Sequence, residues 1–322
     1  MNSVSRIFIH LSVACLLGSA FVFSASGQGA ALRLPRPSQK ASVMQSIGVT
    51  DLTITYSRPA VKGRKLWGDA PSDTYAKGEN TLDNQYKRPE GMPIVPNGHV
   101  WRTGANEATQ FVISEDCMIN GQKLAAGSYS LHTIPGKDEW VIVFNGTANQ
   151  WGSFAYDPAK DTLRVKAKPE WVKQSQELMS FVIDPVTDDS ATVSIRWEKI
   201  RVPFTVTTDT VGITMAKART LIAAAKPDNW SIRYNVGSYA MDNKLTDEGM
   251  RLLTDALAIA DEAIKTKADW RNLNARANIL LSMGRKDEGY AAADKAIAQG
   301  KTEKGVDTAG LEKRVADMKA GK

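Results

Sequence analysis

The chain has 322 residues, of which 43% are hydrophobic, and it carries a formal net charge of +6. This length allows one large domain or two ordinary domains, each with its own apolar core. Basic and acidic residues are mixed along the chain without a dense Lys/Arg block, so we expect no nucleic-acid partner.

The first 27 residues have the pattern of a secretory signal peptide. Arg6 precedes an apolar run over residues 7–23, and small residues follow it up to Gly27. We expect cleavage near Gly27 and an exported protein, periplasmic or extracellular, without a membrane span after cleavage. An uncleaved membrane anchor is the alternative. Cys15 would leave with the signal, and the remaining Cys117 is expected to be a buried thiol rather than a nucleophile.

Strand patterns dominate from residue 41 to residue 208, after a flexible lead-in over residues 28–40. Leu52, Ile54 and Tyr56 share one face of a period-two pattern, which is typical of a half-buried strand. Segment 190–198 alternates in the same way. We count about nine to eleven short strands, which favours an antiparallel β-sandwich or barrel.

Two features lie between these strands. Asn120-Gly121 stands between apolar pairs and predicts a tight hairpin, because both residues tolerate positive φ. The segment 69–93 is rich in Gly, Pro and polar residues, and we interpret it as a surface insertion. A lid over a pocket is the more specific alternative for this segment.

Residues 209–322 are rich in alanine and favour helices. They contain a repeat of 40 residues: Trp230 matches Trp270, and the segment 247–249 (Asp-Glu-Gly) matches 287–289. Residues 284–297 resemble the second helix of a tetratricopeptide hairpin, although that family's unit is about 34 residues long and usually has alanine where this chain has Gly249 and Gly289. The predicted fold class is therefore α+β, segregated, with an N-terminal antiparallel β-domain and C-terminal tetratricopeptide-like helical hairpins.

A second resemblance covers the β-region, from about residue 35 to residue 206. Four runs carry it: residues 54–64 (ITYSRPAVKGR), 101–109 (WRTGANEAT), 119–131 (INGQKLAAGSYSL) and 134–136 (IPG). They resemble the bacterial domain-of-unknown-function family 2911. The resemblance implies a β-fold and export, but no reaction. The 69–93 insertion looks longer than the family's connection at that place.

The run 101–107 supplies the first candidate ligand site. Arg102 offers a planar fork of donors for carboxylates or phosphates, and Asn106 both donates and accepts hydrogen bonds. With Glu107 and Trp101 beside them, these residues could bind a sugar, a peptide terminus or another polar ligand. The alternative is an Arg102–Glu107 ion pair that fixes a loop, with Trp101 in the core.

Arg58 and Arg64 flank a turn that contains Pro59 and Gly63, and they are further candidates for anion binding; a solvated turn is the alternative. His132 is a candidate in a strand-like stretch and could equally be a core residue. Because no spacing of His, Cys or carboxylate residues matches a metal-binding motif, we expect no metal and no cofactor.

We predict a non-catalytic binding module for a polar ligand or an envelope partner, with a helical domain that binds another protein or packs on the β-domain. An extracytoplasmic hydrolase that uses Glu107 and His132 as its acid/base pair is the first alternative. A structural scaffold without a small-molecule site is the second.

Overall fold

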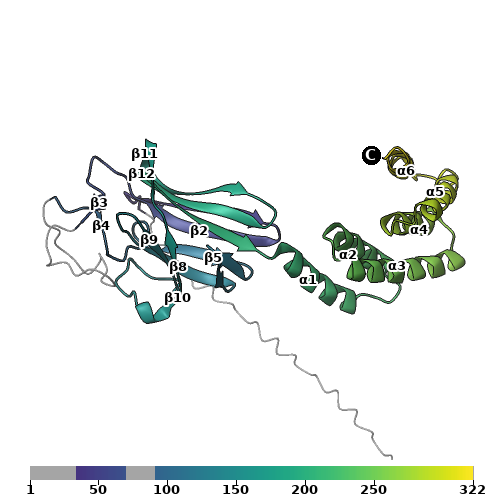
Figure 1. The fold of residues 1–322 in the computed structure, drawn as a ribbon, viewed down its shortest axis with the longest axis horizontal. Helices are drawn as coiled ribbons and strands as arrows, with labels where there is room; N and C mark the ends of the chain where they lie inside the picture. The colour runs from purple at the N-terminus through teal and green to yellow at the C-terminus, as the bar shows by residue number, and fades with distance from the viewer. Residues whose placement is uncertain (1–33, 70–90, 322) are drawn as a thin grey trace, which may run out of the picture. The chain divides into compact units, whose positions relative to one another are not determined.

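The computed structural model describes residues 34–69 and 91–321. The expected signal peptide and nearly all of the 69–93 insertion lie outside these residues. Strands occupy the chain as far as Thr208, and helices follow from Thr210. This arrangement confirms the predicted fold class, α+β with segregated regions (Figure 1).

The β-region contains two antiparallel sheets and a short parallel pair. The larger sheet has the order β1 (Gln39–Ile47), β2 (Thr50–Arg58), β5 (Thr109–Ile113), β8 (Gly127–Ile134), β9 (Trp140–Asn145) and β10 (Asp161–Ala167). The smaller sheet has the order β11 (Glu170–Val186), β12 (Ser190–Thr208), β6 (Cys117–Ile119) and β7 (Gln122–Leu124). Strands β3 (Trp67–Gly68) and β4 (Val95–Pro96) form the parallel pair. The two antiparallel sheets form a sandwich, and the strands in the described residues do not close into a barrel.

Both sheets contribute to one apolar core. On β2, Leu52 and Ile54 are fully buried, as their alternation predicts. On β12, the predicted inward face is buried as well, with Trp197 only 1% exposed. Four indoles meet at the centre, with ring centroids 5.3 to 6.5 Å apart: Trp67, Trp101, Trp140 and Trp197. Burial of such large side chains is the main term that holds the two sheets together.

The strand lengths differ from the expectation of short strands. β11 and β12 have 17 and 19 residues, and they pair with several register shifts. Such shifts let a long ribbon bend. β12 keeps its apolar face buried along its length, whereas β11 also carries exposed apolar residues such as Trp171 and Leu178. The predicted tight turn is confirmed: Asn120 and Gly121 join β6 to β7 with φ of 46° and 79°.

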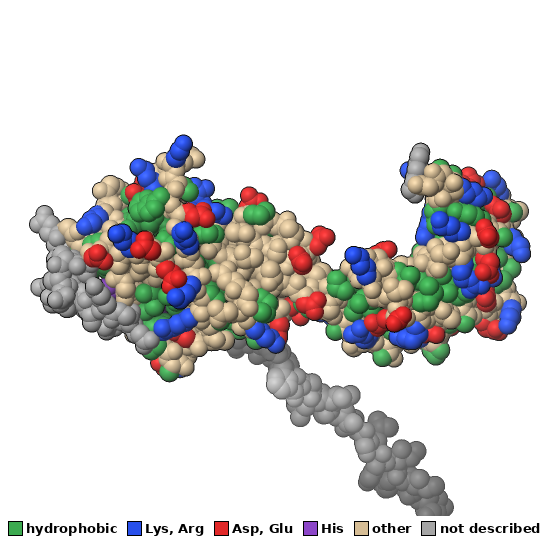
Figure 2. Space-filling view, viewed as in Figure 1, with side chains coloured by type: hydrophobic (Ala, Val, Ile, Leu, Met, Phe, Trp, Pro, Cys, Tyr) green, Lys and Arg blue, Asp and Glu red, His purple; other side chains and the backbone are tan. Residues whose placement is uncertain are grey.

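Six helices follow in the described part of the chain. They are α1 (Thr210–Ala224), α2 (Trp230–Asp242), α3 (Thr246–Thr266), α4 (Trp270–Ser282), α5 (Lys286–Gly300) and α6 (Ala309–Lys319). None of the helices in the described ranges is both long enough and apolar enough to cross a membrane. Basic and acidic side chains are interspersed over the visible face of these helices (Figure 2).

Two glycines stand where neighbouring helices approach each other closely. A Cβ atom on Gly289 would lie 2.6 Å from Cδ2 of Leu281, which is 3% exposed. A Cβ atom on Gly249 would lie 2.9 Å from Cγ and Sδ of Met241, a half-buried and flexible side chain. Glycine rather than alanine stands at both positions for a steric reason, because a Cβ atom would meet the neighbouring helix. The contact would be closer at Gly289 than at Gly249.

We predict that Gly289→Ala lowers the free energy of unfolding by roughly 1 kcal/mol, because overpacking against Leu281 outweighs the better helix propensity of alanine. Gly249→Ala should lower it by less than Gly289→Ala does, because the thioether of Met241 can move aside and the fixed Gly237 carbonyl oxygen lies slightly farther from the new Cβ atom, at 3.0 Å. Urea unfolding followed by circular dichroism measures both. Equal stabilisation of the chain by both substitutions would contradict this account.

Candidate functional site

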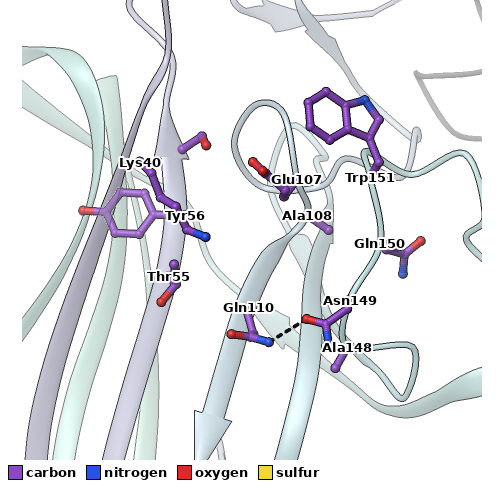
Figure 3. Close-up of a pocket in the computed structure, with 11 residues that line it drawn as sticks. Lys40, Thr55, Tyr56, Glu107, Ala108, Gln110, Ala148, Asn149, Gln150 and Trp151 are labelled. Atoms are coloured by element: carbon purple, nitrogen blue, oxygen red, sulfur yellow. Dashed lines mark hydrogen bonds between the residues drawn. The ribbon is translucent and has the colours of Figure 1, made fainter. Parts of the chain in front are cut away.

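A pocket of about 310 Å³ opens at one end of the larger sheet. The pairing of β2 with β5 ends at Thr55 and Gln110, and the pocket lies beyond this last pair. Its walls come from β1 and β2 on one side, the start of β5 in the middle, and the loop after β9 on the other (Figure 3). We call it the Glu107 pocket; it is lined by Lys40, Thr55, Tyr56, Ser57, Glu107, Ala108, Gln110, Ala148, Asn149, Gln150 and Trp151.

Backbone hydrogen bonds fix the loop after β9 against the segment before β5. The Ala108 N–H donates to the Gln150 carbonyl at 3.0 Å, and the Gly152 N–H donates to the Asn106 carbonyl at 2.9 Å. Between these two hydrogen bonds, Glu107 and Trp151 form an isolated antiparallel β-bridge through their backbones. Their side chains lie near each other in Figure 3. Two segments that are far apart in the sequence are thereby held in one register.

Asn106 has a structural role in this arrangement. Its φ is +61°, in the left-handed region that asparagine tolerates better than most residues. Its side-chain amide donates to the Ser38 carbonyl at 2.9 Å. Asn106 therefore turns the chain so that Glu107 faces the pocket, while its own side chain bonds to the segment before β1.

The side chains of the pocket are polar, with one cation, one anion and several neutral amides. Lys40 is exposed and Glu107 is half-buried. The amide of Gln110 donates to Asn149 Oδ1 at 2.9 Å, which orients both groups along one wall. Trp151 is 54% exposed, an unusual environment for an indole. The pocket can thus offer donors, acceptors and one flat apolar surface to a ligand.

Behind this wall lies a buried polar cluster. Gln150 Nε2 is 3.0 Å from Ser130 Oγ and 3.3 Å from His132 Nε2, and it also donates to the Thr147 carbonyl at 3.1 Å. His132 Nε2 also lies 3.1 Å from Ser130 Oγ, and His132 Nδ1 lies 3.4 Å from Ser153 Oγ. Both imidazole nitrogens thus have polar neighbours inside the cluster.

His132 is fully buried, and burial lowers its pKa from 6.5 to about 4. The charge of Asp161 opposes this shift, whereas that of Arg102 adds to it. The imidazole is therefore neutral at pH 7. His132 does not line the Glu107 pocket; it supports Gln150, which does.

A second polar group fixes the far side of the imidazole. The Tyr156 ring lies 5.0 Å from that of His132, and its hydroxyl donates to Asp161 Oδ2 at 2.7 Å. Asn145 donates to the other oxygen of Asp161 at 2.7 Å, and Arg164 Nε donates to Oδ2 at the same distance. Burial, together with the hydrogen bond to Asp161, raises the pKa of Tyr156. This network holds β10 to the loop that carries Gln150.

The other predicted site residues lie elsewhere. Trp101 is 4% exposed in the core, and its indole N–H donates to the Gly104 carbonyl at 3.1 Å. Arg102 is half-buried and close enough to His132 to affect its charge. Arg58 Nε donates to the Met179 carbonyl at 2.8 Å, which joins β2 to β11. The guanidinium of Arg64 donates hydrogen bonds to the Ala60 and Val61 carbonyls of its own turn. Glu107 is thus the predicted site residue that the structure places in the pocket.

Cys117 is a free, buried thiol, and burial raises its pKa to about 12. This agrees with a structural role rather than a nucleophilic one. Within residues 34–69 and 91–321, no three His, Cys, Asp or Glu side chains are grouped so that they could hold a metal ion.

A comparison with protein-family models matches residues 38–206 to the family described as protein of unknown function (DUF2911). The chain belongs to this family. The match begins just before β1 and ends two residues before the end of β12, so the Glu107 pocket lies inside the DUF2911 domain. No curated protein and no solved structure matches the chain.

Several residues that line the Glu107 pocket were not among the predicted site residues, namely Lys40, Gln110, Asn149 and Gln150. One signal was present: the polar run Asn145–Gln150 directly precedes Trp151, so this indole belongs to a loop rather than to a strand. An aromatic residue in a polar loop is a candidate for exposure. Trp140 begins an apolar run instead, and it is buried.

The lowered pKa of His132 predicts a specific pH dependence of stability. As the pH falls below 6.5 the unfolded chain binds a proton at this residue, whereas the folded chain does not until about pH 4. The free energy of unfolding should therefore fall by roughly 3 kcal/mol between pH 7 and pH 4 because of this group.

Urea unfolding at several pH values, for wild type and His132→Gln, measures this effect. Carboxylates also protonate in this range, so the difference between the two proteins isolates the imidazole. We expect the variant to lose less stability than wild type as the pH falls. An identical pH dependence in both would show that His132 titrates normally in the folded state.

Proposed function

We propose that the DUF2911 domain of this protein is a non-catalytic binding module for a small polar ligand, held in the Glu107 pocket. The observation that carries this proposal is an exposed indole, Trp151, beside a half-buried carboxylate and a wall of amides at the open end of a rigid sheet. A volume of about 310 Å³ is within the range of small-molecule sites.

A sugar is the ligand class that fits this lining best. Hydroxyl groups both donate and accept, and the amides of Gln110 and Asn149 can do the same. The flat, apolar face of a sugar ring can pack on Trp151. Lys40 and Glu107 carry opposite charges, so the lining has no net preference for an anion or a cation. A zwitterion such as an amino acid is the competing class.

The hydrolase alternative has less support. Its acid/base pair would have to share one cavity, but His132 is fully buried behind Gln150 whereas Glu107 lines the pocket. Burial lowers the pKa of His132 to about 4, which makes its imidazole a weak base near neutral pH. A binding function needs only Glu107 at the surface and uses His132 as a support.

The proposal includes export and a role for the helices. The basic residue, apolar run and small residues within positions 1–27 support export to the periplasm or the cell exterior. The repeat of 40 residues and the resemblance to tetratricopeptide hairpins support a protein-interaction role for residues 209–322. A ligand-binding domain and a partner-binding domain would then belong to one exported chain.

A thermal-shift screen with neutral sugars and with zwitterionic amino acids tests the ligand class. A ligand that binds only the folded state stabilises it by about 2.7 kcal/mol at a hundred times its Kd. We expect at least one sugar to raise the Tm of wild type. Trp151→Ala and Glu107→Gln should each weaken the affinity of the protein for that sugar by about tenfold or more.

Two exposed residues outside the pocket provide matched controls. Trp171 is 68% exposed on β11, and Glu139 forms a surface ion pair with Lys166 at 2.9 Å. Trp171→Ala and Glu139→Gln should leave sugar binding unchanged. Equal weakening by pocket and control variants, or shifts by amino acids alone, would count against the sugar.

A further inference from the structure

The helical repeat provides an internal comparison between equivalent surfaces. Helices α2 and α4 begin at Trp230 and Trp270 and have 13 residues each. Helices α3 and α5 begin at Thr246 and Lys286, again 40 positions apart. Each tryptophan therefore occupies the same place at the start of its hairpin, and its surroundings can be compared position by position.

The chain itself covers the surface around Trp270. Helix α5 ends at Gly300, and the turns that follow fold back over the indole. A Cβ atom on Gly300 would lie 2.7 Å from Cε3 of Trp270 and 2.7 Å from Cγ2 of Thr308, so the ring, the glycine and the covering turn are in close contact. Glu303 Oε1 accepts a hydrogen bond from the backbone N–H of Trp270 at 2.9 Å. A carboxylate thus satisfies the first N–H of α4.

The equivalent surface around Trp230 remains open. Helix α3 has 21 residues where α5 has 15, so the chain continues as helix instead of folding back. The position of Gly300 is taken by the fully buried Ala260, so a methyl group stands where the second unit has only a glycine. The position of Glu303 is taken by Ala263, which has no side-chain acceptor.

A groove of about 570 Å³ lies at this surface, lined by Trp230, Ile259, Ala263 and Arg271 among others. A smaller hollow of about 340 Å³ adjoins it and shares Trp230 and Arg271. We call the two together the Trp230 groove. Its floor is partly apolar, and it is large enough for several residues of an extended peptide.

The charges of the groove indicate which peptide fits. Arg271 is exposed and stands where the covered surface has Leu311, which is 5% exposed. Lys226 is exposed in the adjoining hollow. Two acidic and three basic side chains line the two hollows. Glu262 is paired with Lys265 at 2.8 Å and Lys267 with Asp269 at 3.2 Å. The exposed Lys226 and Arg271 therefore stand against one exposed acid of the lining, Asp228. An arginine in such a groove favours a carboxylate from the occupant.

We propose that the Trp230 groove binds an extended, acidic peptide segment of a partner protein. Its carboxylate would bond Arg271, and an aliphatic side chain would pack on the indole, as the turn after α5 packs on Trp270. This proposal rests on the helical region alone and is independent of any ligand in the Glu107 pocket.

Selection of short random peptides displayed on phage, with the whole chain as target, tests the proposal. We expect enriched sequences that combine Asp or Glu with Val, Ile or Leu. Fluorescence polarisation with the enriched peptide should show affinity weakened about tenfold or more by Arg271→Glu. Lys295→Glu reverses an exposed charge on α5 outside the groove and should leave the affinity unchanged.

Trp230→Ala provides the second variant, and circular dichroism establishes that each variant is folded. Arg271→Glu changes an exposed side chain, so the test remains valid even if Trp230→Ala unfolds. Enrichment of basic peptides, or binding that Arg271→Glu does not weaken, would overturn the proposal. So would self-association of wild type that Arg271→Glu abolishes, because the groove would then hold a second copy of the chain.

Discussion

The apolar core shared by the two sheets is the constraint on which the candidate site depends. Trp101 is central to it: its ring lies 5.8 Å from Trp197 and 6.5 Å from Trp140, and its backbone exchanges hydrogen bonds with Thr133 on β8 at 2.8 Å. The turn that carries Glu107 starts directly after this anchor. Since close-packed cores resist displacement, the direction in which the turn leaves the sheet is fixed by packing.

The buried polar cluster around His132 adds a second constraint. Burial penalises a charged imidazole at this position and lowers the pKa of His132. The neutral ring lies within hydrogen-bond distance of Ser130, Gln150 and Ser153. A histidine thus acts here as a support for the pocket wall, and its chemistry as a base is suppressed by the same contacts.

The fold could be predicted from the sequence because alternation and helix propensity are local signals. Leu52, Ile54 and the inward face of β12 follow period two, and their burial agrees. The pocket could not be predicted in the same way. Its walls come from positions 40, 55, 107 and 150, and no periodicity connects them. The pairing of β1, β2 and β5 and the bridge between Glu107 and Trp151 bring these segments together.

Residue type alone also misled the choice of site residues. Arg102, Asn106 and Glu107 are close in sequence, but the left-handed turn at Asn106 directs neighbouring side chains to different environments. Arg58 looked suited to anions, yet the backbone carbonyl of Met179 on β11 accepts its Nε–H. Whether a polar side chain serves the fold or a ligand depends on which acceptors the packing of two sheets brings near it.

The helical region shows how small sequence differences open or close equivalent surfaces. From the first unit to the second, Ala260 corresponds to Gly300, Ala263 to Glu303, and Arg271 to Leu311. Gly300 lets the ring lie on the helix, Glu303 caps the start of α4, and Leu311 can be buried. An arginine in the place of Leu311 could not be buried without a partner for its charge. The first unit therefore cannot cover its tryptophan as the second does, and the open groove follows from the residues that form it.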